Sequence, residues 1–108
     1  MKPLVSVVVP FFNEEDNVAP LAERVAAVFT EMPDYEYECL FVNDGSRDAT
    51  RARIEAEREK NARVRPIHLV KNRGQSAALV AGMRRAKGDY ILTLDGDLQN
   101  DPCVFPKM

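Results

Sequence analysis

Short apolar runs rich in β-branched residues alternate along the chain with longer segments of helical periodicity. Residues 4–10 (LVSVVVP) form a continuous apolar run that ends at a proline, which is typical of a strand covered on both faces in a parallel sheet. Similar runs at 37–42 (YECLFV), 64–70 (VRPIHLV) and 90–94 (YILTL) predict three more strands. Pro66 cannot donate a ladder hydrogen bond, so the third strand should lie at an edge or begin there.

The segment after the first strand has apolar residues at three- and four-residue spacing, which predicts a helix. Asn13, Asp16 or Asn17 can cap it, and Pro20 then falls in its first turn, where proline is tolerated. Pro33 and the residue after it should end the helix. The apolar positions are Val18, Leu21, Val25, Val28, Phe29 and Met32.

Two further helices are predicted. Ser46 or Asp48 can cap the second, which reaches about Asn61 and carries so many charges that its charge run should be a solvated face. The third, residues 76–86, is alanine-rich and contains Gly82, as expected for a helix pressed closely against a sheet. The packing candidates of the second helix are Ala49, Ala52, Ile54 and Ala56.

Strands and helices alternate through the whole chain, which predicts right-handed crossovers around a sheet covered by helices. We therefore expect an α/β fold, a Rossmann-like three-layer α/β/α arrangement with a mostly parallel sheet. A length of 108 residues suits one core, so residues 1–108 should form a single domain. Ligands of such sheets bind at the carboxyl ends of the strands.

Charge and cysteine content narrow the class of protein. The 15 basic and 17 acidic residues leave a net charge of −2, which argues against nucleic acid as a partner. No apolar run approaches the roughly twenty residues of a membrane-spanning helix. Cys39 and Cys103 show no CxxC spacing and can be small buried hydrophobes, so neither a disulfide nor a zinc site is indicated. A cytoplasmic location is expected.

A polar cluster follows each predicted strand. Residues 12–15 (FNEE) can be a helix start with acidic side chains near the helix dipole, residues 43–46 (NDGS) a tight turn, and residues 72–75 (NRGQ) a loop with a strained glycine. A carboxylate such as Asp44 at a strand end can also accept hydrogen bonds from a nucleobase or a ribose hydroxyl. None of these three clusters is diagnostic alone.

The fourth cluster, residues 95–99 (DGDLQ), points more strongly to chemistry. Asp95, Asp97 and Gln99 can turn several oxygens toward one hard cation such as Mg²⁺ or Mn²⁺. A polar turn that ends the strand is the structural alternative. The position at a strand end favours a metal whose remaining ligands are substrate phosphates.

The segments VVVPFFNEEDN, VNDGSRDAT, NRGQSAALVAG and LDGDLQNDP, in this order, resemble the N-terminal part of a family 2 glycosyltransferase of the GT-A fold. The dolichyl- or polyprenyl-phosphate sugar transferases are the most similar group. The resemblance implies transfer of a sugar, with inversion and with Mg²⁺ or Mn²⁺, from a UDP- or GDP-sugar. The implied acceptor is a polyprenyl phosphate or another lipid or glycan, for cell-envelope or glycoconjugate synthesis.

The resemblance also implies roles for individual residues. It places donor-binding residues along the nucleotide pocket, Asp44 at the base or ribose, and the divalent cation on three residues of the fourth cluster. Asn43 stands where many relatives have aspartate, and Gly96 where alanine is frequent. The implied donor-binding residues are Pro10, Asn13, Glu15, Asp44, Asn72, Gly74 and Asp95, and the implied metal ligands are Asp95, Asp97 and Gln99. In the third segment Ala78 and Gly82 imply close helix packing.

In that family the acceptor site and any general base follow the metal motif, so we expect them beyond Met108, with residues 105–108 beginning another helix. The 108 residues alone should then be inactive and prone to self-association through an uncovered sheet edge. Membrane contact, at the cytoplasmic face, is expected only through later segments. His68, the one histidine, lies in an apolar strand pattern and should be a structural core residue rather than a catalyst.

Other functional classes remain open from the residues themselves. A regulatory or nucleotide-binding α/β module without transfer activity is one alternative. A phosphoacceptor receiver would place its carboxylates after the first and third strands, whereas here they follow the second and fourth. A nucleotidyltransferase also uses a divalent ion and a diphosphate leaving group. Dinucleotide binding is disfavoured because GxGxxG is absent after the first strand.

Overall fold

The computed structural model describes residues 2–94 and 103–106. In this part of the chain one sheet has the strand order β3-β2-β1-β4-β5, with β1 to β4 parallel and β5 antiparallel to β4. The strands are β1 (Leu4–Phe11), β2 (Glu36–Asn43), β3 (Val64–His68), β4 (Tyr90–Thr93) and β5 (Cys103–Pro106). The helices are α1 (Glu15–Thr30), α2 (Thr50–Lys60) and α3 (Gln75–Arg85).

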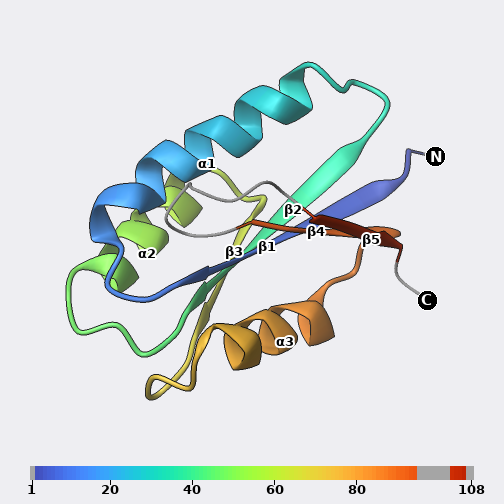
Figure 1. Cartoon of the computed structure of the whole chain (residues 1–108). Helices are drawn as coiled ribbons and strands as arrows, with labels where there is room; N and C mark the ends of the chain where they lie inside the picture. Colours follow the sequence, from blue (N-terminus) through green and yellow to red (C-terminus); the bar gives the residue numbers. More distant parts are fainter. Residues whose placement is uncertain (1, 95–102, 107–108) are drawn as a thin grey trace.

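The helices cover both faces of the sheet, with α1 and α2 on one face and α3 on the other (Figure 1). The strand order explains this division. From β1 to β3 the chain steps in one direction, and it then returns past β2 and β1 to place β4 on the far side of β1. When the direction of right-handed crossovers reverses, the connecting helix moves to the opposite face. The predicted three-layer α/β/α fold with a mostly parallel sheet is confirmed.

Alternate side chains of β1 enter two separate cores, as the continuous apolar run predicts. Val7, Val9 and Phe11 pack with α1 and α2, whereas Val8 packs beneath α3. Phe11 also meets Phe41 of β2 edge to face, with ring centroids 5.2 Å apart. Burial on both faces holds β1 at the centre of the molecule, and its carboxyl end therefore has a fixed position.

Cys39 of β2 is a buried residue of the α1 core, as predicted. Burial raises the pKa of its thiol to about 12, and the nearby charge of Glu38 acts in the same direction. The thiol is therefore protonated and acts as a small hydrophobe.

Gly82 allows α3 to approach the sheet closely. A Cβ at this position would lie 2.4 Å from Val8 Cγ1 and 3.1 Å from Val42 Cγ2. The expected tight packing of this helix is confirmed.

The start of α1 differs from the sequence prediction. The helix begins at Glu15, and its N-cap is Glu14 without a side-chain cap, so the prediction of Asn13, Asp16 or Asn17 as a cap is wrong. Pro20 accordingly lies in the second turn. Hydrogen bonds from the chain after β2, described below, hold the helix start in place of a side-chain cap.

Two other predictions need correction. β3 ends at His68 rather than at residue 70, although its place at the sheet edge agrees with Pro66. The predicted helix start at Phe105 and Pro106 is wrong, because Cys103–Pro106 pair with β4 as a strand. β-Branched and aromatic residues favour strands, and the outer edge of β4 offers pairing groups. Among the described residues, no helix has the length and apolar content needed to cross a membrane.

Candidate functional site

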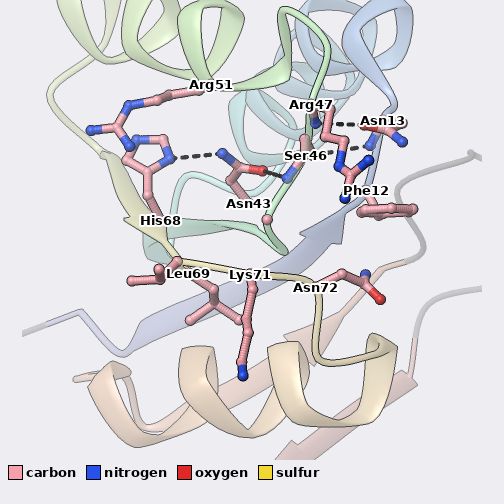
Figure 2. Close-up of a pocket in the computed structure, with 12 residues that line it drawn as sticks. Phe12, Asn13, Asn43, Ser46, Arg47, Arg51, His68, Leu69, Lys71 and Asn72 are labelled. Carbon is pink, nitrogen blue, oxygen red and sulfur yellow. Dashed lines mark hydrogen bonds between the residues drawn. The ribbon is translucent and has the colours of Figure 1, made fainter.

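An open cleft of about 810 Å³ lies where the loops after β1, β2 and β3 meet, at the carboxyl ends of these strands (Figure 2). This is the edge at which open α/β sheets bind their ligands. The cleft is lined by Phe12, Asn13, Asn43, Gly45, Ser46, Arg47, Arg51, His68, Leu69, Val70, Lys71 and Asn72.

The lining of the cleft combines positive charge with apolar surface. Arg47, Arg51 and Lys71 contribute cationic groups, and the described lining residues include no carboxylate. Phe12 is 44% exposed and Val70 is fully exposed. Such a surface suits an anionic ligand that also has a flat apolar part, because the cations attract charge and the apolar side chains can pack on a ring.

The Asp44 carboxylate joins the loop after β3 to the end of β2. Its Oδ1 accepts a hydrogen bond from the Arg73 N–H (2.8 Å), and its Oδ2 accepts from Asn72 Nδ2 (2.9 Å) and from the Gly74 N–H (3.0 Å). Asp44 is only 2% exposed. Its side chain therefore lies behind the cleft wall and holds the loop that forms it.

Gly45 brings the same two segments into backbone contact. It adopts a left-handed φ of +68°, and a Cβ there would lie 2.3 Å from both Lys71 C and Asn72 N. Only glycine tolerates both the conformation and the close approach. The turn after β2 and the loop after β3 thus form one continuous wall of the cleft.

Asn13 links the loop after β1 to the turn after β2. It has an unusual left-handed φ of 52°. Its N–H donates to Ser46 Oγ (3.0 Å), and its own Oδ1 accepts from the Arg47 N–H (2.8 Å). These reciprocal bonds are drawn in Figure 2. They join the loop after β1 to the turn after β2 and so fix the position of this turn relative to β1.

N–H groups at the start of α1 are bonded to one side chain of the β2–α2 loop and to the side chain of the first residue of α2. The Glu14 N–H donates to Thr50 Oγ1 (3.0 Å), and the Glu15 N–H donates to Asp48 Oδ2 (3.4 Å). Asp48 Oδ1 accepts from the Thr50 N–H (2.9 Å), but the N-cap of α2 is Ala49 without a side-chain cap, so the prediction of Ser46 or Asp48 as its cap is wrong. Partial burial raises the pKa of Asp48, but hydrogen bonds from Thr50 and from the Glu15 N–H outweigh it and lower the pKa.

His68 lies at the end of β3, on the cleft and outside both core clusters. Its Nδ1 is 3.1 Å from Asn43 Nδ2, and its Nε2 is 2.7 Å from Glu55 Oε2 on α2. The expectation of a packed core residue is therefore wrong, because the ring is held by polar groups on both sides. The sequence prediction missed it since the strand ends at this residue and not two residues later.

The structure brings together part of the predicted donor-binding set. Asn13 and Asn72 line the cleft, and Asp44 and Gly74 lie directly behind it. Pro10 is buried within β1, and Glu15 is the half-buried first residue of α1. The predicted Asp95, Asp97 and Gln99 lie outside the described residues. Within those described, no group of three or more His, Cys, Asp or Glu side chains could hold a metal.

The cationic residues Arg47, Arg51 and Lys71 were not among the predicted site residues. Each lies within a few positions of a strand-end cluster, and this proximity to a turn is the signal that could have identified them. A basic residue beside a turn is common, however, and only the fold shows that these three share one cleft.

Residues 6–108 of the chain match the sequence model of glycosyl transferase family 2. The chain belongs to this family. The resemblance stated from the four motifs is thereby confirmed, and the GT-A fold that it implies agrees with the sheet order and the layers described above.

Comparison with two curated relatives shows what share of their length this chain covers. The dodecaprenyl-phosphate galacturonate synthase of Rhizobium johnstonii is 50% identical over 106 residues, which cover 96% of this chain and 31% of the relative. The undecaprenyl-phosphate 4-deoxy-4-formamido-L-arabinose transferase of Pseudomonas fluorescens is 40% identical over 105 residues, covering 96% and 30%. The chain therefore spans about a third of the length of the curated relatives it matches.

Solved structures of glycosyltransferases share the fold. Residues 1–349 of S. aureus TarS in complex with UDP-GlcNAc align with a TM-score of 0.66 and 26% identity, over 90% of this chain and 27% of that fragment. The mannosyltransferase PcManGT from Pyrobaculum calidifontis, in complex with GDP-Man and Mn²⁺, aligns with a TM-score of 0.72 and 22% identity, over 90% and 28%. The predicted GT-A arrangement of the sheet and helices is confirmed.

Proposed function

We propose that the protein transfers a sugar from a UDP- or GDP-sugar to a polyprenyl phosphate, and that the nucleotide binds in the cleft at the ends of β1, β2 and β3. The two curated relatives are named as polyprenyl-phosphate sugar transferases, which supports this acceptor class. The TarS complex with UDP-GlcNAc supports a nucleotide-sugar donor. Since polyprenyl phosphates reside in membranes, the site of action is the cytoplasmic face of a membrane.

The cleft itself is the observation that carries the proposal. A nucleoside diphosphate combines a flat ring with negative charge, and the cleft offers Phe12 and Val70 beside Arg47, Arg51 and Lys71. Cations in a cleft raise the local concentration of an anionic substrate.

The donor-binding residues have two kinds of role in this proposal. Asn13 and Asn72 stand on the cleft wall, where they can meet the donor. Asp44 and Gly74 act from behind it, because the Gly74 N–H and Asp44 carboxylate bond to each other. Pro10 and Glu15 fix the two ends of the loop after β1.

Asp95, Asp97 and Gln99 are the proposed ligands of Mg²⁺ or Mn²⁺, with Asp95 also next to the donor. Two carboxylates and an amide oxygen suit such hard cations. When bound, the cation would offset the negative charge that grows on the departing nucleoside diphosphate. PcManGT, whose structure contains Mn²⁺, shares the fold of this chain.

Transfer with inversion follows from attack on the face opposite the leaving group. An oxygen of the acceptor phosphate forms a bond to the anomeric carbon, while the bond from that carbon to the diphosphate breaks and its electron pair stays on the diphosphate oxygen. A phosphate monoester has its second ionisation near pH 6, so at neutral pH the attacking oxygen is already anionic. A phosphate acceptor therefore needs no protein base.

Family membership argues against the alternatives of a regulatory nucleotide-binding module and a nucleotidyltransferase. The chain matches glycosyl transferase family 2 over residues 6–108, which includes all four polar clusters. Each cluster is thus part of a sugar-transferase pattern.

Titration calorimetry with UDP and GDP, with and without Mn²⁺, tests the proposal. We expect one nucleotide to bind more tightly in the presence of Mn²⁺, because the cation reduces repulsion between the diphosphate and the carboxylates. Asp97→Ala should abolish this coupling. Asp34→Ala, at an exposed position in the turn between α1 and β2, is the matched control and should retain it. Absence of nucleotide binding, or coupling that survives in Asp97→Ala, would contradict the assignment.

A further inference from the structure

A backbone group fixes the orientation of the Asn43 amide. The Ser46 N–H donates to Asn43 Oδ1 over 2.9 Å, and a backbone N–H can only donate. The amide oxygen therefore faces Ser46, and the amide nitrogen faces His68 Nδ1 at 3.1 Å. Because an amide nitrogen can only donate, His68 Nδ1 must accept and carries no proton.

The other ring nitrogen of His68 then carries the proton. A neutral imidazole has one protonated nitrogen, and His68 Nε2 lies 2.7 Å from Glu55 Oε2, which accepts. The bonds thus run in one direction, from Ser46 to Asn43, from Asn43 to His68 and from His68 to Glu55. Figure 2 shows the first two as dashed lines across the top of the cleft.

These three hydrogen bonds hold one wall of the cleft in position. Asn43, Ser46 and His68 all line it, and Asn43 is only 3% exposed. Without the acceptor on His68, a buried amide N–H would have no partner, and that loss favours rotation of the amide. Rotation would present N–H₂ to the Ser46 N–H and break the bond that holds the turn.

We propose that His68 is a positioning residue for nucleotide binding. In its neutral Nε2–H form it orients the Asn43 amide, which holds Ser46 and the cleft wall at residues 45–47. The inference rests on the proposed function, because the wall matters for binding only if the nucleotide occupies this cleft. His68 acts through Asn43, and no contact between His68 and the donor is required.

Nitrogen-15 NMR of the imidazole, at slightly alkaline pH, tests the first step on the wild-type protein without any ligand. We expect an unprotonated Nδ1 and a protonated Nε2. In Asn43→Asp an oxygen replaces the amide nitrogen, so the ring must place a proton on Nδ1, and the NMR signature should change accordingly. A protonated Nδ1 in the wild type would overturn the inference.

Affinity for UDP and GDP in the presence of Mn²⁺ tests the second step. His68→Phe keeps a planar ring but removes both hydrogen bonds, and we expect about tenfold weaker binding. His68→Asn returns an acceptor near the position of Nδ1 and should restore most of the affinity. The matched control, Asn61→Ala, removes side-chain bonds to the Tyr37 hydroxyl (3.2 Å) and from the Arg63 N–H (3.0 Å) before β3, and its affinity should equal that of the wild type.

The outcomes separate the two proposals. If folded His68→Phe binds as well as the wild type, or if His68→Asn binds as weakly as His68→Phe, the positioning role is wrong while the proposed function stands. If the wild type binds neither UDP nor GDP, the proposed function fails, and the positioning role fails with it. Thermal melting of each variant identifies those that are folded, and the NMR result on the wild type decides the tautomer if His68→Phe does not fold.

Discussion

Asp44 carries three hydrogen bonds on a side chain that is almost fully buried, and each bond ends on the loop after β3. A carboxylate accepts at both oxygens, so this residue alone can satisfy two backbone N–H groups and one amide at the same time. Its effect on a bound nucleotide would be transmitted by the loop at residues 72–74.

Asp44→Asn replaces one accepting oxygen with an N–H₂ group that faces donors. We expect the free energy of unfolding to fall by about 1–3 kcal/mol and nucleotide binding to weaken by a similar amount. Urea denaturation and calorimetry measure the two effects. Asp34→Asn, at an exposed position, is the control and should change neither. Weaker binding at unchanged stability would instead indicate direct contact between Asp44 and the nucleotide.

Sequence patterns identify the polar residues near the cleft but not what they bind. The partner of Asp44 is 29 residues away at Arg73, and the partner of Asn13 is 33 residues away at Ser46. Local spacing contains no information on contacts at such separations. A buried polar residue that holds a loop and an exposed polar residue that contacts a ligand therefore have the same sequence pattern.

At the scale of elements, periodicity is a better guide. The four parallel strands and the three helices follow from apolar runs and helical spacing, because burial of apolar side chains decides both. Two features did not follow. The start of α1 depends on Asp48 and Thr50 at the start of α2, and β5 forms because β4 offers an edge, a condition that only the assembled sheet provides.

Gly82 marks a close contact between α3 and the sheet, and Gly82→Ala tests it. Alanine raises helix propensity by about 1 kcal/mol, but its Cβ would lie 2.4 Å from Val8 Cγ1, and overpacking costs about 1–3 kcal/mol. We expect a net loss of stability in urea denaturation. Ser76→Ala, at an exposed position of α3, should be neutral or slightly stabilising.

Val8→Ala provides the second arm of this test. It removes the methyl group that the new Cβ would meet, so the double variant should be more stable than the sum of the two single effects predicts. Strict additivity would show that Val8 is not the group that limits the approach of α3.

At the scale of the whole molecule, Glu38 ties together the end of the sheet opposite the cleft. Its carboxylate accepts hydrogen bonds from Ser6 of β1, from Arg65 of β3 and from the Lys87 N–H before β4. Ser6 Oγ in turn accepts from the Gly88 N–H (2.8 Å). One buried carboxylate thus joins three strands and the linker that follows α3.

Burial raises the pKa of Glu38, but the hydrogen bonds from Ser6, the Lys87 N–H and Arg65 outweigh it and lower the pKa below the ordinary value of 4.5. A carboxylate with a lowered folded-state pKa stabilises the fold above its unfolded pKa. This stabilisation disappears as pH falls through the folded value. Acid should therefore weaken the end of the molecule that lies away from the cleft.

Glu38→Gln should lower the free energy of unfolding at neutral pH by about 1–3 kcal/mol. The difference from the wild type should shrink as pH falls below 4.5. Urea denaturation over this range measures it. Glu36→Gln on the same strand is the control, because the Glu36–Arg63 pair (2.9 Å) is about half exposed and such pairs contribute about 0–1 kcal/mol. A constant difference between Glu38→Gln and the wild type at all pH values would contradict the prediction.

The hydrogen bonds at the start of α1 also couple the folding of the first two strand-helix units. Asn13, Glu14 and Glu15 find their partners 33 to 36 residues later, at Ser46, Thr50 and Asp48. A ribosome adds roughly 5–20 residues per second, so β1 and α1 leave it seconds before these partners exist. Until then the first helix has open amides at its start, and its strand lacks a neighbour on either side. The first two strand-helix units consequently reach the native state together, as one cooperative folding unit.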